Sequence, residues 1–212
     1  MKISVLCSDP THPVFSALQD WATRHSGAHE IELVTGSDAL SGGDILFLIS
    51  CQEIIGRSTR ERYVKTLVLH AGDLPERRGW SPHIWTVLDG ENDITVTLLE
   101  ADDGVDTGAI WKKMSISLEG HELYDEINRL LFDAELELMD FAVKNFGTVQ
   151  PHPQNAKNAT YCRRRRPEDS RIDPDRPLRE QFNLLRVSDP SRYPAFFELN
   201  GYIYDLVIKR RG

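Results

Sequence analysis

A histidine and an aspartate stand out among the 212 residues as a pair that could move protons. His70 closes a short apolar run and precedes a Gly-Asp-Leu-Pro turn, whereas Asp106 lies in the loop sequence GVDTG, soon after a second apolar run. A carboxylate beside an imidazole fixes the tautomer of the histidine and favours its charged form, which suits a general acid near neutral pH. The alternative is structural: His70 ends a strand, and Asp106 makes a turn with the two residues that follow it.

The surrounding sequence predicts an α/β fold that could bring this pair together. Predicted strands occupy residues 3–7, 31–34, 45–50, 67–69 and 94–99. Apolar residues at helical spacing follow the first strand and return in the longest predicted helix, residues 123–142. Strands separated by helices indicate a Rossmann-like, open and mainly parallel sheet, in which ligands bind beyond the carboxyl ends of the strands. His70 and Asp106 come within hydrogen-bonding reach if their two strands are neighbours.

The composition changes after the long helix. The segment that follows it is rich in Pro, Asn, Arg and Asp and lacks periodicity, which is typical of a surface segment. A short helix is predicted at residues 178–187, followed by a β-hairpin whose two-residue turn is Asn200-Gly201. We therefore expect a catalytic domain at residues 1–150 and a small C-terminal β extension at residues 151–212.

Composition disfavours several classes of protein. With 40% hydrophobic residues the chain can fill a core, so disorder of the whole chain is excluded. The longest apolar run, residues 45–50, is far shorter than the roughly 20 residues of a membrane helix, and no leader is visible. We expect a cytoplasmic protein with no membrane partner. A net charge of -8 argues against nucleic acid as a partner, and three widely spaced cysteines argue against disulfides and a metal site.

Two loops resemble those of the formyltransferase family that uses 10-formyltetrahydrofolate. The family loops have the forms N-x-H-x-S-x-L-P-x-x-R-G and D-x-G-x-D-T-G, and this chain has VLHAGDLPERRG and DDGVDTG. The interval from His70 to Asp106, 36 residues (106 minus 70), is about what the family shows. The resemblance implies the formyltransferase fold, with 10-formyltetrahydrofolate as co-substrate and its pteridine between the two loops. It also implies that protonated His70 stabilises the formyl oxygen and that Asp106 supports the imidazolium.

The same resemblance assigns further binding residues. The expected donor-binding residues are Ile54, Asp102, Asp103, Gly104 and Gly108. The expected acceptor-binding residues are Arg78, Gly79, Trp80, Arg186 and Tyr193. The family needs no metal, and none is expected here.

The first loop departs from the family pattern at two positions. Gly72 replaces the family serine, which removes one hydroxyl group. Val68 stands where the family has an asparagine, so the amide that helps to hold the formyl oxygen is absent. Either another hydrogen-bond donor replaces it, or the chain is a folate- or sugar-nucleotide-binding protein whose site has decayed.

The C-terminal sequence points to the acceptor. The segments YCRRRRPEDSRIDP and LLRVSDPSRYPAFFELNGYIY resemble those of sugar N-formyltransferases, most closely of pseudaminic-acid-type pathways in cell-surface glycan biosynthesis. The resemblance implies formylation of the 4-amino group of a nucleotide-linked sugar, similar to UDP-4-amino-4,6-dideoxy-N-acetyl-altrosamine. The tail is shorter than the barrel domain of the tRNA enzymes. A formyl hydrolase, or a formyltransferase with another acceptor, is the alternative within enzymes.

Several other residues have a structural interpretation as well as a functional one. The basic run at 163–166 is typical of a solvated face, although an arginine cluster can also hold a diphosphate. The sequence gives no reason to treat His83, His121 or His152 as more than surface or satisfied residues. The apolar C-terminal hairpin is expected either to pack within the chain or to form a homodimer.

Overall fold

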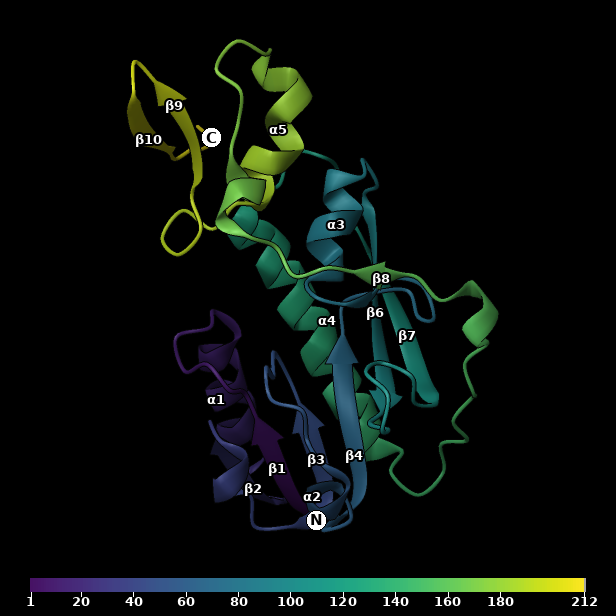
Figure 1. Cartoon of the computed structure of the whole chain (residues 1–212). Coiled ribbons are helices and arrows are strands. Elements are labelled where there is room, and N and C mark those ends of the chain that lie inside the picture. Colours follow the sequence, from purple (N-terminus) through teal and green to yellow (C-terminus); the bar gives the residue numbers. More distant parts are fainter. Residues whose placement is uncertain (212) are drawn as a thin grey trace.

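The computed structural model describes residues 1–211, and its centre is a six-stranded sheet (Figure 1). In spatial order the strands are β2 (Glu30–Val34), β1 (Lys2–Leu6), β3 (Gly43–Leu48), β4 (Tyr63–His70), β6 (Asp93–Glu100) and β7 (Ile110–Ser117). The first four are parallel, and β6 is antiparallel to both of its neighbours. The prediction of an open, mainly parallel α/β sheet is confirmed.

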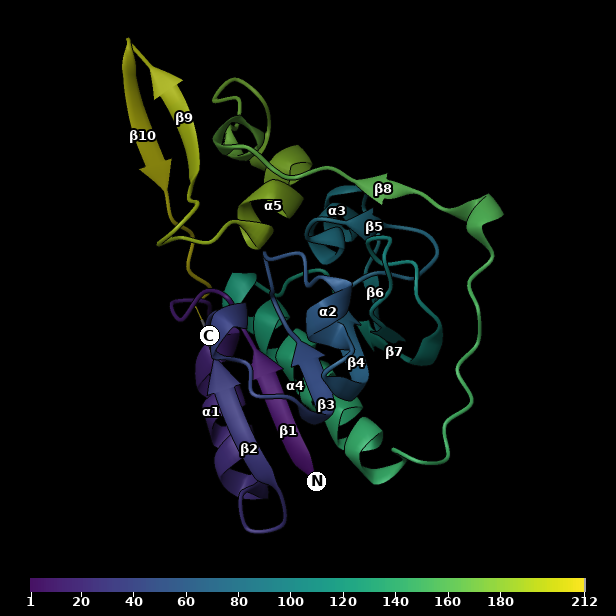
Figure 2. The same cartoon turned by 60° about the horizontal axis from the view of Figure 1, so that its bottom comes forward.

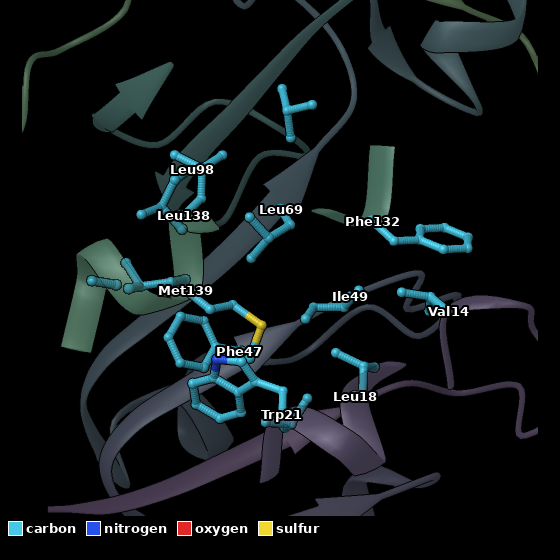
Figure 3. Close-up of a cluster of buried hydrophobic side chains, with 14 of the residues drawn as sticks. Val14, Leu18, Trp21, Phe47, Ile49, Leu69, Leu98, Phe132, Leu138 and Met139 are labelled. Carbon is cyan, nitrogen blue, oxygen red and sulfur yellow. The ribbon is translucent and has the colours of Figure 1, made fainter. Parts of the chain in front are cut away.

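Two helices cover one face of this sheet. They are α1 (Val14–His25) and α4 (Tyr124–Lys144), and both place apolar residues at intervals of three and four against the strands. Figure 3 shows Trp21 of α1 and Met139 of α4 close to Phe47 of β3. The indole N–H of Trp21 donates to Asp140 over 2.6 Å, which ties the two helices together. No helix within residues 1–211 is long and apolar enough to cross a membrane.

The opposite face of the sheet has its own apolar cluster. It consists of buried residues from β1, β3, the start of β4 and the connections between them: Leu6, Leu40, Leu46, Leu48, Ile55 and Tyr63. The short elements η1 (Ser37–Ala39) and α2 (Arg57–Arg60) lie in these connections. Because successive side chains of a strand point to opposite faces, Thr66, Val68 and His70 of β4 share this face, and Val68 packs against the cluster.

The strand that ends at His70, β4, and the strand that precedes the Asp106 loop, β6, are neighbours. A mainly parallel sheet was expected, but these two strands run in opposite directions. β4 and β6 pair antiparallel, with His70 opposite Thr97 and Leu67 opposite Glu100. The end of β6 therefore lies beside the middle of β4 and not beside His70. The loop at 101–109 turns back from that point to bring Asp106 to the histidine. β7 and α3 (Pro82–Leu88) are absent from the sequence-based prediction.

The C-terminal part of the chain follows α4. It contains η2 (Ala156–Asn158), β8 (Tyr161–Cys162), η3 (Pro167–Ser170), α5 (Leu178–Val187), β9 (Ala195–Leu199) and β10 (Tyr202–Leu206). β8 pairs in parallel with β5 (Arg78–Gly79), beside the first family-like loop. The predicted hairpin is present, and both residues of its turn, Asn200 and Gly201, have positive φ as a type I′ turn requires. Figures 1 and 2 show this hairpin projecting beyond α5.

Candidate active site

The structure brings His70 and Asp106 together at the end of β4. Nδ1 of His70 lies 3.5 Å from Oδ2 of Asp106, and the two side chains are only 6% and 10% exposed. Nε2 of His70 lies 2.8 Å from the backbone oxygen of Arg77. Both ring nitrogens thus face oxygen atoms that can accept hydrogen bonds. The separation between Nδ1 and the carboxylate is longer than a full hydrogen bond.

Asp106 is held from outside its own loop. Its backbone is in the left-handed region, with φ of 55°, which is uncommon for a residue other than glycine. The carboxylate accepts a hydrogen bond of 2.8 Å from the backbone N–H of Gly79. The side-chain amide of Gln154 donates to the backbone oxygens of Asp106 and Gly108, over 2.9 Å and 2.8 Å. Gln154 could not be identified from the sequence, because nothing in its aperiodic segment indicates which loop it reaches.

Arg78 and Gly79, two of the expected acceptor-binding residues, lie in this supporting network. Arg78 is buried and donates to Gln154 over 2.7 Å and to the hydroxyl of Tyr161 over 3.2 Å. Gly79 has φ of +94°, and a Cβ there would lie 2.5 Å from the backbone oxygen of Cys162. Only glycine therefore allows β5 to pair with β8 while its N–H points at Asp106. The observed contacts of Arg78 and Gly79 therefore help to hold Asp106 beside His70.

The expected donor-binding loops are joined by an arginine that the sequence did not identify. Arg60 donates to the backbone oxygens of Ile55 and Asp102, over 3.1 Å and 2.8 Å, and it forms an ion pair with Asp103. Ile54, which directly precedes Ile55, is 85% exposed. Arg60 therefore fixes the loop after β3 relative to the loop after β6.

The two expected donor-binding glycines shape the second loop. A Cβ at Gly108 would lie 1.9 Å from the backbone oxygen of Glu100, so any side chain there would force the loop away from β6. A Cβ at Gly104 would lie 2.6 Å from the hydroxyl of Thr107, which bonds to the backbone oxygen of Gly104. Both positions therefore allow the tight return that carries Asp106 to His70.

The structure contradicts the assignment of Arg186 to acceptor binding. Its side chain is 1% exposed, and its guanidinium donates to Asn183 over 2.9 Å and to Asn92 over 2.8 Å. Glu122 lies 3.6 Å away. Arg186 joins α5 to Asn92, just before β6, and its side chain is almost completely covered. Its place in a family-like segment therefore reflects packing.

The other expected acceptor residues are accessible. Trp80 is 40% exposed, with the guanidinium of Arg164 4.7 Å from its ring centre. Tyr193 is 58% exposed and has Arg192 5.5 Å from its ring centre. In the basic run, Arg163 is bound by both carboxylate oxygens of Asp169, at 2.7 Å and 2.6 Å. The run is therefore partly neutralised, and its members have different surroundings.

Two further sequence interpretations meet different outcomes. Val68 lies among apolar side chains, so the position of the family asparagine offers no hydrogen-bond donor. His83, interpreted from the sequence as a surface or satisfied residue, is partly exposed. Its Nδ1 is buried and has no hydrogen-bond partner within residues 1–211.

Comparisons with known proteins agree with the architecture. The family model described as formyl transferase matches residues 1–143. A methionyl-tRNA formyltransferase from Clostridium thermocellum is similar over 100% of this chain and 94% of its own, with 22% identity and a TM-score of 0.84. HypX from Aquifex aeolicus in complex with tetrahydrofolic acid is similar over 98% of this chain and 37% of its own, with 23% identity and a TM-score of 0.81.

A third similar structure is a 4-N formyltransferase from Francisella tularensis. It is 17% identical, with a TM-score of 0.71, over 100% of this chain and 98% of its own. At these identities the solved structures establish the fold. The family model, which covers about two thirds of the residues, establishes the ancestry. The chain belongs to the formyl transferase family.

Proposed function

We propose that this protein transfers a formyl group from 10-formyltetrahydrofolate to the 4-amino group of a nucleotide-linked 4-amino-4,6-dideoxy sugar. The observation that carries the proposal is the buried contact between His70 and Asp106, in a chain of the formyl transferase family. A buried histidine whose two nitrogens both face acceptors can stabilise negative charge on a formyl oxygen. The acceptor is similar to UDP-4-amino-4,6-dideoxy-N-acetyl-altrosamine.

The residues around the two joined loops fit a pteridine. Ile54 and Val105 are exposed apolar side chains, one on each loop, and backbone polar groups lie near both. A flat ring with apolar faces and a polar edge needs this combination. Asp102, Asp103, Gly104 and Gly108 contribute the backbone of the second loop. Arg60 holds the two loops at a fixed separation.

The chain's own groups divide the chemical work. A neutral amine of the acceptor attacks the formyl carbon, and His70 stabilises the oxygen through Nδ1–H. Asp106 balances the charge of the imidazolium and receives the amine proton, directly or through water, on its way to N10 of the folate. Val68 cannot replace the family amide, so oxyanion stabilisation falls to His70 and to backbone N–H groups of the loops.

The identity of the acceptor is proposed from the net charge and the C-terminal segments. Tail length does not discriminate, because the methionyl-tRNA formyltransferase from Clostridium thermocellum is matched over 94% of its chain. The net charge of -8 argues against a tRNA acceptor, since tRNA binding depends on excess positive charge. The family-like C-terminal segments support a sugar amine.

We also propose that the protein is a homodimer through its C-terminal hairpin. Leu199, Tyr202, Ile203 and Tyr204 are all substantially exposed on β9 and β10. A two-stranded hairpin is marginally stable in water by itself, and a second copy would cover these side chains.

Mass spectrometry tests the proposed reaction. The protein is incubated with 10-formyltetrahydrofolate and a panel of UDP- and dTDP-linked 4-amino sugars, with His70→Ala in parallel. A mass gain of one formyl group on one sugar, absent with His70→Ala, is the expected result. Folate binding without formylation of any sugar would favour the decayed-site alternative, and Val68→Asn would then restore activity. Release of formate without an acceptor would indicate a hydrolase.

A further inference from the structure

Three successive residues at the end of the first family-like loop each contact one part of the catalytic pair. The backbone oxygen of Arg77 lies 2.8 Å from Nε2 of His70. The backbone N–H of Gly79 donates to the carboxylate of Asp106 over 2.8 Å. Arg78, between them, reaches the backbone of Asp106 through the side chain of Gln154. Residues 77–79 are therefore a common support for both members of the pair.

The side-chain amide of Gln154 has one orientation that satisfies its neighbours. Nη2 of Arg78, 2.7 Å away, can only donate, so the atom that faces it is the amide oxygen. The backbone oxygens of Asp106 and Gly108, at 2.9 Å and 2.8 Å from the other end of the amide, can only accept. The amide nitrogen therefore uses both of its hydrogens to hold the loop, and Arg78 determines which way the amide faces.

Arg78 is a buried charge that is oriented by neutral groups. Its side chain belongs to a residue that is only 4% exposed. The terminal nitrogens donate to the amide oxygen of Gln154 and, over 3.2 Å, to the hydroxyl of Tyr161, and Nε has no partner within residues 1–211. Burying a charge without a counter-ion destabilises a fold, so stability does not account for an arginine at this position. Its contact with Gln154 indicates a role in the site.

The contacts form a closed cycle that includes Asp106. The cycle runs from the carboxylate to the N–H of Gly79, through the side chains of Arg78 and Gln154, and back to the backbone oxygen of Asp106. Asp106 needs such support because its backbone has φ of 55°, a conformation that costs energy in residues other than glycine. Both the backbone and the carboxylate of Asp106 are therefore fixed relative to β5.

We propose that Arg78 and Gln154 are positioning residues for formyl transfer, which hold the carboxylate of Asp106 beside Nδ1 of His70. The proposal rests on the proposed function and deepens it, because it assigns Arg78 to the support of the catalytic pair and not to acceptor binding. Both residues act through Asp106. Their loss therefore lowers kcat and leaves the KM values of both substrates nearly unchanged.

Gln154→Glu separates positioning from stability. A glutamate has nearly the same shape and gives the buried Arg78 a carboxylate partner, but it has no hydrogens for the two backbone oxygens. The expected result is a fall in kcat of about 10- to 100-fold, the effect of displacing a catalytic group by about 1 Å, with a melting temperature close to that of the wild type. Both KM values should stay within about a factor of two.

Two further variants frame this result. Gln154→Met keeps the length of the side chain and loses all three hydrogen bonds, so its kcat should fall at least as far as that of Gln154→Glu. Gln150→Glu adds the same charge at an exposed position of the same segment and should leave kcat unchanged. Wild-type kcat in Gln154→Glu or Gln154→Met would overturn the proposal.

Substitutions of Arg78 test whether it acts through Gln154. Arg78→Lys keeps a charged donor, whereas Arg78→Met leaves the amide without one, so kcat should decrease from the wild type to Arg78→Lys to Arg78→Met. The double variant Arg78→Met/Gln154→Met should be no slower than Gln154→Met alone, because the two residues share one route to Asp106. If the effects of the two single substitutions multiply in the double variant, Arg78 acts independently and its proposed role is refuted.

NMR of the histidine ring nitrogens tests the geometry without any substrate. The signals of His70 are assigned by their absence in His70→Ala. They are expected to move in the uncharged variant Gln154→Met, whereas those of the exposed His121 stay in place. Unchanged His70 signals would overturn the proposal. If the wild type formylates no amino sugar, the proposed function fails, and these spectra still determine whether Gln154 fixes the surroundings of His70.

Discussion

The backbone N–H of Gly79 donates a hydrogen bond to the carboxylate of Asp106 over 2.8 Å. The donor belongs to β5, and the acceptor belongs to a loop that follows β6. The orientation of the carboxylate toward His70 is therefore set by a strand 27 residues earlier in the chain. This contact converts a loop residue into a fixed partner for the histidine.

Asp106→Asn is expected to lower kcat by about 10²- to 10⁴-fold, the usual contribution of a positioned acid or base. An asparagine keeps the shape but cannot balance the imidazolium charge or receive a proton. Steady-state kinetics with saturating donor and acceptor measures the effect. Asp20→Asn, on the exposed side of α1, is the control. Wild-type kcat in Asp106→Asn would show that the carboxylate has no role in the reaction.

Gly72→Ser, which restores the family residue, is expected to reduce activity by about 10- to 100-fold, because displacement of a catalytic group by about 1 Å has effects of this size. A Cβ at Gly72 would lie 2.8 Å from Nε2 of His70 and equally close to the backbone oxygen of Arg77. The substitution therefore displaces the imidazole. Gly147→Ser is the matched control, because a Cβ there meets nothing within 4 Å. An equally active Gly72→Ser would mean that this loop adjusts freely.

Arg60→Gln is expected to raise the KM for 10-formyltetrahydrofolate by about 10-fold, equivalent to one or two charge-assisted hydrogen bonds. The KM for the acceptor should stay within a factor of two of the wild type, because the hydrogen bonds and the ion pair of Arg60 are made to the two donor loops. Initial-rate measurements over both substrates separate these effects. Arg57→Gln provides a control in the same helix, where the native side chain pairs with Glu61 at the surface. An equal rise in both KM values would contradict the assignment of these loops to the donor.

Glu135 makes stability depend on pH. Burial in α4 raises the pKa of its carboxyl from 4.5 to about 8. Between these values the folded chain holds a proton that the unfolded chain has lost, so the free energy of unfolding falls as pH rises. The slope approaches about 1.4 kcal/mol per pH unit inside this window and vanishes below it.

Glu135→Gln is expected to remove that slope, and denaturant titrations at pH 5.5 and 8.5 measure it. The free energy of unfolding of the variant, minus that of the wild type, should be larger at pH 8.5 than at pH 5.5. Glu137→Gln, on the exposed side of the same helix, should retain the wild-type pH dependence. If Glu135→Gln retains it as well, the carboxyl ionises without penalty in the folded chain.

Ile203→Glu is expected to halve the molar mass measured by light scattering, because a charge on the exposed face of β10 opposes burial against a second copy. Val64→Glu adds the same charge at another exposed apolar position and should not change the mass. A monomeric wild type would remove the dimer proposal.

The sheet was predictable where local pattern and tertiary environment agree. The apolar residues 45–48 of β3 and the amphipathic pattern of α4 predict burial through composition and spacing. β7 escaped prediction because Lys112 and Lys113 interrupt its alternation. The antiparallel pairing of β4 with β6 is set by a long connection, whose path has no local signal.

The candidate site divides in the same way. His70 and Asp106 could be predicted because their loops carry residues in a fixed order. Gln154 could not, since it gains its role from partners far away in sequence. Arg186 shows the opposite error, where a recognisable segment contains a residue that serves packing.

The segment from residue 152 to 162 lies beyond the part of the chain matched by the family model, yet it fastens the catalytic loops. His152 pairs with Ile110, Gln154 holds the Asp106 loop, and β8 holds β5. A protein shortened to residues 1–143 would keep the helices and strands of its core and still lack the geometry for formyl transfer. A chimaera that transfers acceptor specificity between relatives would therefore need residues 152–162 from the same parent as the catalytic loops that they hold.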